Sequence, residues 1–156
     1  MQVFLDLQIA LDDTDNLPNE DQITRWAHGA LQGAGYEASE AELTVRFVDN
    51  AEIQDLNKTY RHKDYPTNIL SFPFECPDGV ELPLLGDLII AKAVVEKEAL
   101  EQQKTLEEHY AHLIVHGVLH LLGYDHIESE DAAIMEPLEI SIVQSLGYDN
   151  PYKDEI

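Results

Sequence analysis

Three histidines near residue 120 have the spacing of a metal site. His116 and His120 are four residues apart, and His126 follows six residues later, after Gly123. Residues four apart in a helix stack one turn above each other on one face, so both imidazoles can reach one ion. The glycine lets the chain turn sharply and bring the third imidazole back. Three neutral imidazoles suit Zn²⁺ and leave a fourth position open in a catalytic site.

These histidines have other possible roles, because an i, i+4 pair alone also occurs in packed or solvated helices. The single cysteine, Cys76, could close the fourth position, and the metal would then be structural. His112 lies on the same stripe, about 12 Å from His120 along the helix axis. We therefore expect His112 to lie behind the ligands or to be partly buried, and we expect His109, near the helix start, to lie at the surface.

The spacing also matches the zinc-protease pattern H-E-x-x-H-x-x-G-x-x-H at each histidine and at Gly123. The residue after the first histidine is Gly117, however, where those proteases carry the glutamate that takes a proton from the metal-bound water. Its absence indicates a related metal geometry with different chemistry. The base could come from Asp125 or from the substrate, or the metal alone could supply enough hydroxide.

A helix over about 106–122 must carry two of these histidines. Thr105, with Glu108 three residues later, forms a capping box that starts it, and Gly123 suits the left-handed residue beyond its end. Helical patterns flank it over about 92–103 and about 129–146, and Pro137 should kink or restart the second. The histidine-bearing helix therefore belongs to a helical C-terminal half.

The N-terminal half alternates strands with helices. Strand patterns cover 3–9, 43–47, 70–74 and 87–91, and Asn19 and Asn50 are candidate N-caps of the helices between them. Pro73 cannot donate to a sheet ladder, so its strand is predicted at an edge or a bulge. Together the elements predict a single α+β layered domain over 1–156, with a small mixed sheet of about four strands and about five helices.

The composition restricts the partners. The chain has 156 residues, 44% hydrophobic and 26% charged, which is typical of a globular domain, and its net charge is 9 − 31 = −22. The electrostatic field of this negative charge repels polyanions at long range, so a nucleic-acid contact requires a local basic patch or a partner protein. The longest uncharged stretch, Leu113 to Tyr124, has 12 residues, against about 20 for a membrane span. We expect a cytoplasmic protein without a membrane partner.

Several basic residues gather in one stretch. Four of the nine, Arg46, Lys58, Arg61 and Lys63, fall within 18 residues and could line a groove for an RNA backbone. A solvated helix face accounts equally well for Lys58 and Lys63. Asp87 could accept a hydrogen bond from a ligand histidine or merely end a strand.

Three segments and the tail resemble the YbeY family, bacterial single-strand-specific endoribonucleases that mature ribosomal RNA. The first is the histidine segment, His116-Gly117-x-Leu119-His120-Leu121-x-Gly123-Tyr124-Asp125-His126. The next two are Leu56-Asn57-x-x-Tyr60-Arg61-x-x-Asp64-x-Pro66-Thr67-Asn68-Ile69-Leu70-Ser71-Phe72-Pro73 and Leu85-Gly86-Asp87-Leu88-Ile89-Ile90. The tail is similar to that of gamma-proteobacterial members, with Leu146-Gly147-Tyr148-x-x-Pro151-Tyr152.

The resemblance implies one Zn²⁺ ion per chain, held by His116, His120 and His126. It also implies a functional Arg61, whose guanidinium could donate two parallel hydrogen bonds to phosphoryl oxygens as charge develops there. From spacing alone, Arg61 is more readily explained as a helix-end cation or a surface ion pair. The implied substrate is single-stranded ribosomal RNA, in maturation of the 16S 3′ end and in ribosome quality control. The ribosome or its proteins are the implied partners, and DNA is not.

Two other functions stay open. A metallopeptidase or another metal-dependent hydrolase shares the histidine spacing, although Gly117 counts against a peptidase. A non-catalytic ribosome assembly factor with a structural metal would use the acidic surface to bind basic ribosomal proteins.

Overall fold

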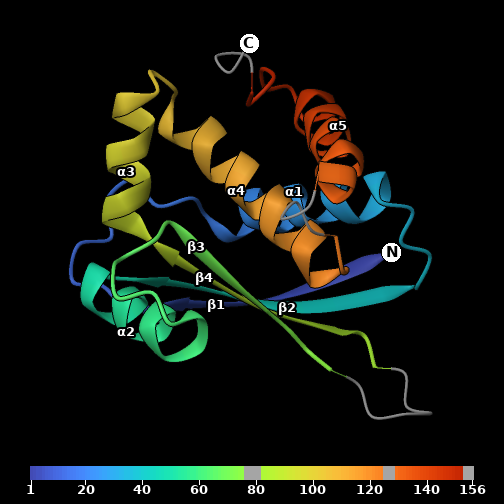
Figure 1. Cartoon of the computed structure of the whole chain (residues 1–156). Helices are drawn as coiled ribbons and strands as arrows, with labels where there is room; N and C mark the ends of the chain where they lie inside the picture. Colours follow the sequence, from blue (N-terminus) through green and yellow to red (C-terminus); the bar gives the residue numbers. More distant parts are fainter. Residues whose placement is uncertain (76–81, 125–128, 153–156) are drawn as a thin grey trace.

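The computed structural model describes residues 1–75, 82–124 and 129–152, which form a four-stranded mixed sheet and five helices in one small domain (Figure 1). This confirms the predicted α+β class. In chain order the elements are β1 (Gln2–Ile9), α1 (Glu20–Gly33), β2 (Glu40–Val48), α2 (Asn50–Arg61), β3 (Ile69–Pro73), β4 (Leu84–Ala91), α3 (Lys92–Glu101), α4 (Leu106–Leu121) and α5 (Ser129–Ser145).

The sheet has the strand order β1-β2-β4-β3. β1, β2 and β4 run parallel, and β3 pairs antiparallel with β4. Because β3 is an edge strand, the missing N–H of Pro73 can be accommodated there, as the sequence predicts. The parallel step from β1 to β2 passes through α1, and the step from β2 to β4 passes through α2 and β3.

Two hydrophobic clusters lie on opposite faces of the sheet. Every second residue of β2 from Ala41 to Phe47 is buried in the larger cluster, together with side chains of α1, α4 and α5. The smaller cluster contains Val48, Ile53 and Leu70 and lies under α2. Figure 1 shows α1, α4 and α5 on one side of the sheet and α2 on the other.

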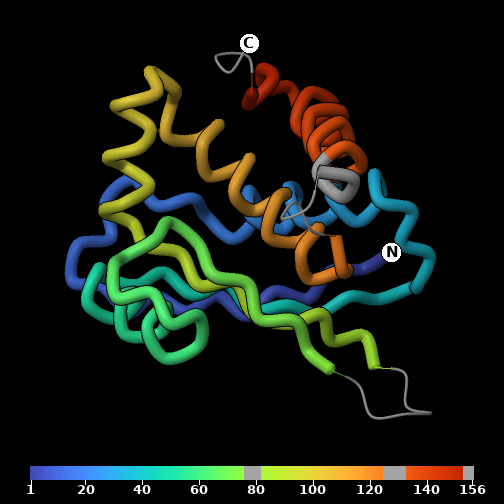
Figure 2. Tube along the Cα trace, viewed as in Figure 1, coloured from blue at the N-terminus to red at the C-terminus, as the bar shows by residue number. Residues whose placement is uncertain are grey.

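Helix α4 lies in the middle of the helical layer and crosses above the strands (Figure 2). Its predicted capping box is present: Thr105 Oγ1 accepts from the Glu108 N–H at 3.2 Å, and Glu108 Oε1 accepts from the Thr105 N–H at 2.9 Å. Gly117 permits a close approach to the sheet, because a Cβ atom there would lie 2.7 Å from Leu88 Cδ2 and 3.0 Å from Ile69 Cδ1. Side chains of β3 and β4 therefore set the distance between α4 and the sheet.

One local prediction was wrong. Asp49 rather than Asn50 is the N-cap of α2, and its carboxylate accepts from the Glu52 N–H at 2.8 Å. Both residue types cap well, and the position at which β2 ends decides between them. Of the two outcomes predicted for Pro137, the restart does not occur, because α5 continues through the proline from Ser129 to Ser145. Packing of α5 against α1 and α4 outweighs the local cost of the proline.

Among the helices described, none combines the length and the apolar character needed to cross a bilayer.

Candidate metal centre

A buried carboxylate joins α4 to α5. Glu139, on α5, has no exposed surface. Its Oε1 lies 2.7 Å from His116 Nδ1, and its Oε2 lies 2.8 Å from His112 Nε2. Tyr152, in the chain after α5, donates to the same Oε2 from its hydroxyl at 2.6 Å. Three donors from two segments of the chain thus converge on one carboxylate.

The ionisation of Glu139 fixes where His116 carries its proton. Burial raises the pKa of Glu139, but hydrogen bonds from His112 and His116 outweigh burial and lower it to about 2. A carboxylate only accepts hydrogen bonds, so His116 Nδ1 carries a proton, and in the neutral ring Nε2 keeps the lone pair. This tautomer makes Nε2 the available metal ligand.

The same Nε2 atom of His116 lies 3.0 Å from Nε2 of His120. The two rings have centroids 4.5 Å apart and are inclined at 73°. Nitrogen ligands of tetrahedral Zn²⁺, at 2.0–2.1 Å from the ion, are about 3.3 Å apart. The separation of the two nitrogens is therefore suited to sharing one ion, as the i, i+4 spacing predicts.

His112 lies further along the same stripe of α4 and contacts Glu139 rather than His120. Its side chain is 13% exposed. Burial lowers the pKa of His112 more than the bond to Glu139 raises it, so the ring is neutral at neutral pH. The ring lies 6.1 Å from that of His116 and 5.3 Å from that of Tyr152. Within the described residues, His112 Nδ1 is buried without a hydrogen-bond partner.

His112, His116 and Glu139 could themselves hold a metal ion, because one ligand atom of each lies within 4.8 Å of the others. In the alternative arrangement, with the ion between the Nε2 atoms of His116 and His120, Glu139 lies behind His116 and orients it. Ligand histidines commonly donate their second N–H to a carboxylate in this way. The remaining predicted ligand, His126, and its neighbour Asp125 lie outside the described residues.

His109 corrects the expectation of a surface position. It is 4% exposed, and its Nε2 lies 3.0 Å from Glu98 Oε1. Asn68 Nδ2 donates to the same oxygen at 3.0 Å. The histidine is buried because α3 packs on the first turns of α4, a contact that the periodicity of α4 alone does not reveal.

Arg46, predicted to contact RNA, lies on β2 and is part of an ion pair. Its Nε and Nη2 donate to Glu52 at 2.8 Å and 3.2 Å, and its Nη1 donates to Gln8 at 3.1 Å. The guanidinium is therefore held against the sheet and α2.

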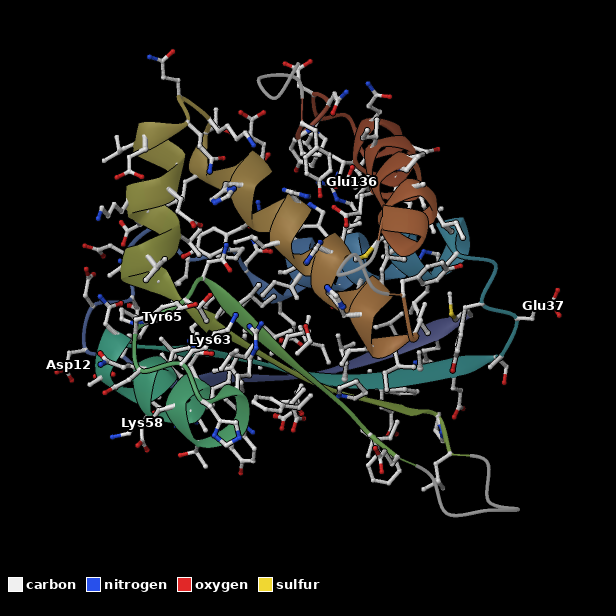
Figure 3. The ribbon with its side chains drawn as sticks, in the orientation of Figure 1. Asp12, Glu37, Lys58, Lys63, Tyr65 and Glu136 are labelled. Carbon is white, nitrogen blue, oxygen red and sulfur yellow. The ribbon has the colours of Figure 1, made fainter. Side chains whose placement is uncertain are left out.

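The other three basic residues of the stretch are exposed. Arg61 is the last residue of α2, and Lys63 follows in the next loop. Lys58 Nζ lies 3.9 Å from Asp64 Oδ2, with both side chains more than half exposed. Figure 3 shows Lys58 and Lys63 at α2 and the loop after it, whereas Glu136 lies on α5.

Asp87 lies on β4 with an exposed side chain, and the next residue, Leu88, is buried in the cluster beneath α4. Successive strand residues face opposite sides of the sheet, so Asp87 faces away from α4. The carboxylate that accepts from His116 is that of Glu139.

Glu139 and Tyr152 are candidate functional residues that sequence reasoning missed. Glu139 falls on the stripe of α5 that contains Met135 and Ile142, both buried. An acid on an apolar stripe needs a partner, and this was the available signal. Tyr152 belongs to the tail segment already noted for its resemblance.

Comparison with known proteins agrees with this architecture. The family model described as Endoribonuclease YbeY matches residues 8–147. The solution structure of TM1509 from Thermotoga maritima is similar, with a TM-score of 0.60 and 24% identity, over 92% of this chain and 88% of that chain. This second likeness concerns the fold. Because the family match extends from β1 to beyond α5, the chain belongs to the YbeY endoribonuclease family.

Proposed function

We propose that this chain is a zinc-dependent, single-strand-specific endoribonuclease that acts on ribosomal RNA in the cytoplasm. Its tasks would be maturation of the 16S 3′ end and ribosome quality control, with residues 1–156 forming one hydrolase domain. Family membership supports an endoribonuclease role in ribosomal RNA processing. The observation that carries the metal dependence is the 3.0 Å approach of His116 Nε2 and His120 Nε2, with Glu139 behind the first ring.

The donor set suits zinc. His116 and His120 would supply two nitrogens and His126 the third. When bound, Zn²⁺ polarises a phosphoryl oxygen and lowers the pKa of water. Glu139 holds the proton of His116 on Nδ1, so that the lone pair of Nε2 stays directed away from α5. Asp125, beside His126 in the sequence, is a candidate base.

Arg61 would hold the phosphate group that is attacked. It lies at the exposed end of α2, and a guanidinium can donate two parallel hydrogen bonds to the developing charge. Lys58 and Lys63 would attract the RNA backbone locally, which a chain of net charge −22 requires. Arg46 would contribute only after leaving Glu52. The acidic remainder of the surface suits basic ribosomal proteins as partners.

A metallopeptidase is the less favoured candidate because of the position of Gly117. This residue is buried, and a Cβ atom there would already lie 2.7 Å from Leu88 Cδ2. A glutamate side chain at this position would enter the packed interface between α4 and the sheet. The protease-type general base therefore has no room in this fold.

Cleavage of matched single- and double-stranded RNA tests the proposal, with metal content measured on each sample. The variants are Arg61→Ala and His120→Ala, and the control is Lys97→Ala, which removes an exposed cation from α3. We expect wild type and the control to cleave the single-stranded RNA. Arg61→Ala should keep zinc and lose cleavage, whereas His120→Ala should lose both.

Three results would contradict the proposal. Equal cleavage by all four proteins would indicate a contaminating nuclease. Peptide cleavage that His120→Ala abolishes would favour the peptidase. A folded wild type that binds zinc without cleaving RNA, together with a His116→Ala variant that unfolds, would favour an assembly factor with a structural metal.

A further inference from the structure

We propose that Glu139 is a positioning residue of the metal centre and that Tyr152 holds its carboxylate in place. The two residues select which nitrogen of His116 is available to a metal. The inference rests on the proposed function only for its zinc-binding readout, because the state of His116 can be measured without zinc.

The contacts of Glu139 leave it little freedom. Both oxygens are engaged, Oε1 with His116 Nδ1 at 2.7 Å and Oε2 with His112 Nε2 at 2.8 Å. The side chain has no exposed surface, so water cannot replace these donors without opening the interface between α4 and α5. Since the carboxylate accepts, a rotation of the His116 ring by half a turn would break the bond at Nδ1. The bond therefore keeps Nε2 turned toward His120.

Tyr152 connects this carboxylate to the end of the described chain. Its hydroxyl donates to Glu139 Oε2 at 2.6 Å, and its ring lies 5.3 Å from that of His112 at 82°. The preceding carbonyl, of Pro151, accepts from Lys104 Nζ at 2.8 Å, just before α4 begins. Figure 2 shows this red end of the chain on the same side of the sheet as α4 and α5. The tail thus ties the start of α4 to Glu139.

The chain offers matched controls for both residues. Glu136 is one turn earlier on α5 and only partly buried. Tyr148 lies in the same tail, but its hydroxyl donates to Glu107 at 2.9 Å and accepts from Arg25 at 3.0 Å. Glu139→Gln and Tyr152→Phe can therefore be compared with Glu136→Gln and Tyr148→Phe, which remove the same groups elsewhere.

The first readout is the tautomer of the His116 ring, measured by long-range ¹H–¹⁵N NMR on protein kept metal-free with a chelator. We expect wild type and both controls to carry the proton on Nδ1. In Glu139→Gln the ring should populate both tautomers, because an amide can donate to Nδ1 as well as accept from it. A role limited to packing would leave the tautomer unchanged.

The second readout is zinc affinity, measured by competition with a chromophoric chelator. Loss of a carboxylate behind a ligand histidine weakens metal binding roughly 10–100-fold, and we expect this for Glu139→Gln. Tyr152→Phe should give a smaller loss in the same direction, and both controls should bind zinc like wild type. The same NMR experiment with zinc added should show Nε2 of His116 as the coordinated atom.

A folded Glu139→Gln variant with the wild-type tautomer and zinc affinity would overturn the inference, as would zinc on His116 Nδ1 in the wild type. If Glu139→Gln does not fold, the zinc affinity of Tyr152→Phe tests the inference instead. An affinity equal to that of wild type would then overturn the proposed role of Tyr152 and of the Glu139 carboxylate that it holds. If wild type binds no zinc, the tautomer decides alone. Absence of RNA cleavage, with both readouts as expected, would remove the proposed function and leave this inference standing.

Discussion

Glu139 and Arg46 are both charged and both hydrogen-bonded, but they differ in burial and in the sequence distance to their partners. Glu139 is fully buried, and its partners His116 and His112 are 23 and 27 residues away in sequence. Arg46 is 33% exposed in its side chain, and its ionic partner, Glu52, is only six residues away. The charged residues around α2 therefore form local surface pairs, whereas the buried carboxylate between α4 and α5 is paired with residues distant in sequence.

This difference has a functional meaning under the proposed activity. Exposed ion pairs contribute little and rearrange easily, so the basic residues near α2 can adapt to a flexible RNA chain. Buried hydrogen bonds are costly to leave unmade, so the histidines of α4 are held in one orientation before any ion binds. A metal centre requires such fixed geometry, whereas a surface that follows a backbone does not.

The largest loss of stability is expected from Gly117→Glu, which would disrupt the packing of α4 on the sheet. The side chain would push α4 away from Leu88 and bury an unpaired charge, at a cost of about 4–5 kcal/mol or more in the free energy of unfolding. Gly117→Ala is the control and should cost about 1–3 kcal/mol, because only flexible side-chain ends must shift. Urea denaturation of the chelated protein measures both. Wild-type stability in the glutamate variant would show that α4 does not depend on this contact.

Arg61→Ala tests the exposed basic residues near α2. We expect kcat to fall about 10²–10³-fold, the usual effect of losing a donor to developing charge. Zinc content and the denaturation midpoint should match wild type, because Arg61 is exposed at the end of α2. The measurement combines single-turnover RNA cleavage with metal analysis, and Lys97→Ala is the control. A parallel loss of zinc would mean that the two regions are not independent.

Acid should weaken the buried region through Glu139. Its folded pKa is about 2 against an ordinary 4.5, so the ionised carboxylate contributes stability above about pH 4.5 that is lost as the pH falls toward 2. The contribution is roughly 3 kcal/mol at neutral pH. Glu139→Gln lacks it, so the difference in unfolding free energy between wild type and variant should change by this amount between pH 5 and 2.

His112 acts in the same direction on acidification. Burial lowers its folded pKa, so the unfolded chain binds the proton more readily and stability falls as the pH drops through the ordinary 6.5. Both proteins contain His112, but the bond to Glu139 raises its pKa in wild type alone, so Glu139→Gln loses at least as much stability through His112 as wild type does. Urea titrations in chelator at stepped pH give the difference in unfolding free energy, and an advantage of wild type that grows rather than shrinks between pH 5 and 2 would refute the low pKa of Glu139.

The smallest effects are expected from Lys58→Ala and Lys63→Ala. Both side chains are exposed, so each substitution should change the free energy of unfolding by less than about 0.5 kcal/mol. Each should also reduce the slope of log affinity for single-stranded RNA against log salt by about one. Fluorescence anisotropy at several salt concentrations measures this slope. A slope equal to that of wild type and of Lys97→Ala would place the RNA contact elsewhere.

The sequence by itself determined the local pieces of this protein. The N-cap at Asn19 and the capping box at Thr105 were predicted and are present, because each is made between residues three apart. The missing N–H of Pro73 predicted an edge strand or a bulge, and β3 is an edge strand. The approach of His116 to His120 follows from one helical turn. These features depend on neighbours in the chain, so spacing is enough to predict them.

Only the tertiary structure decided what surrounds those pieces. The burial of His109 depends on Glu98 of α3, and the orientation of His116 depends on Glu139 of α5. The bond from Arg46 Nη1 to Gln8 Oε1, 38 residues away, likewise depends on how β1 pairs with β2. Helical periodicity identifies which residues share a face, but it does not identify which element covers that face. That choice is made by side-chain packing between segments tens of residues apart, and it determines which carboxylate meets which histidine.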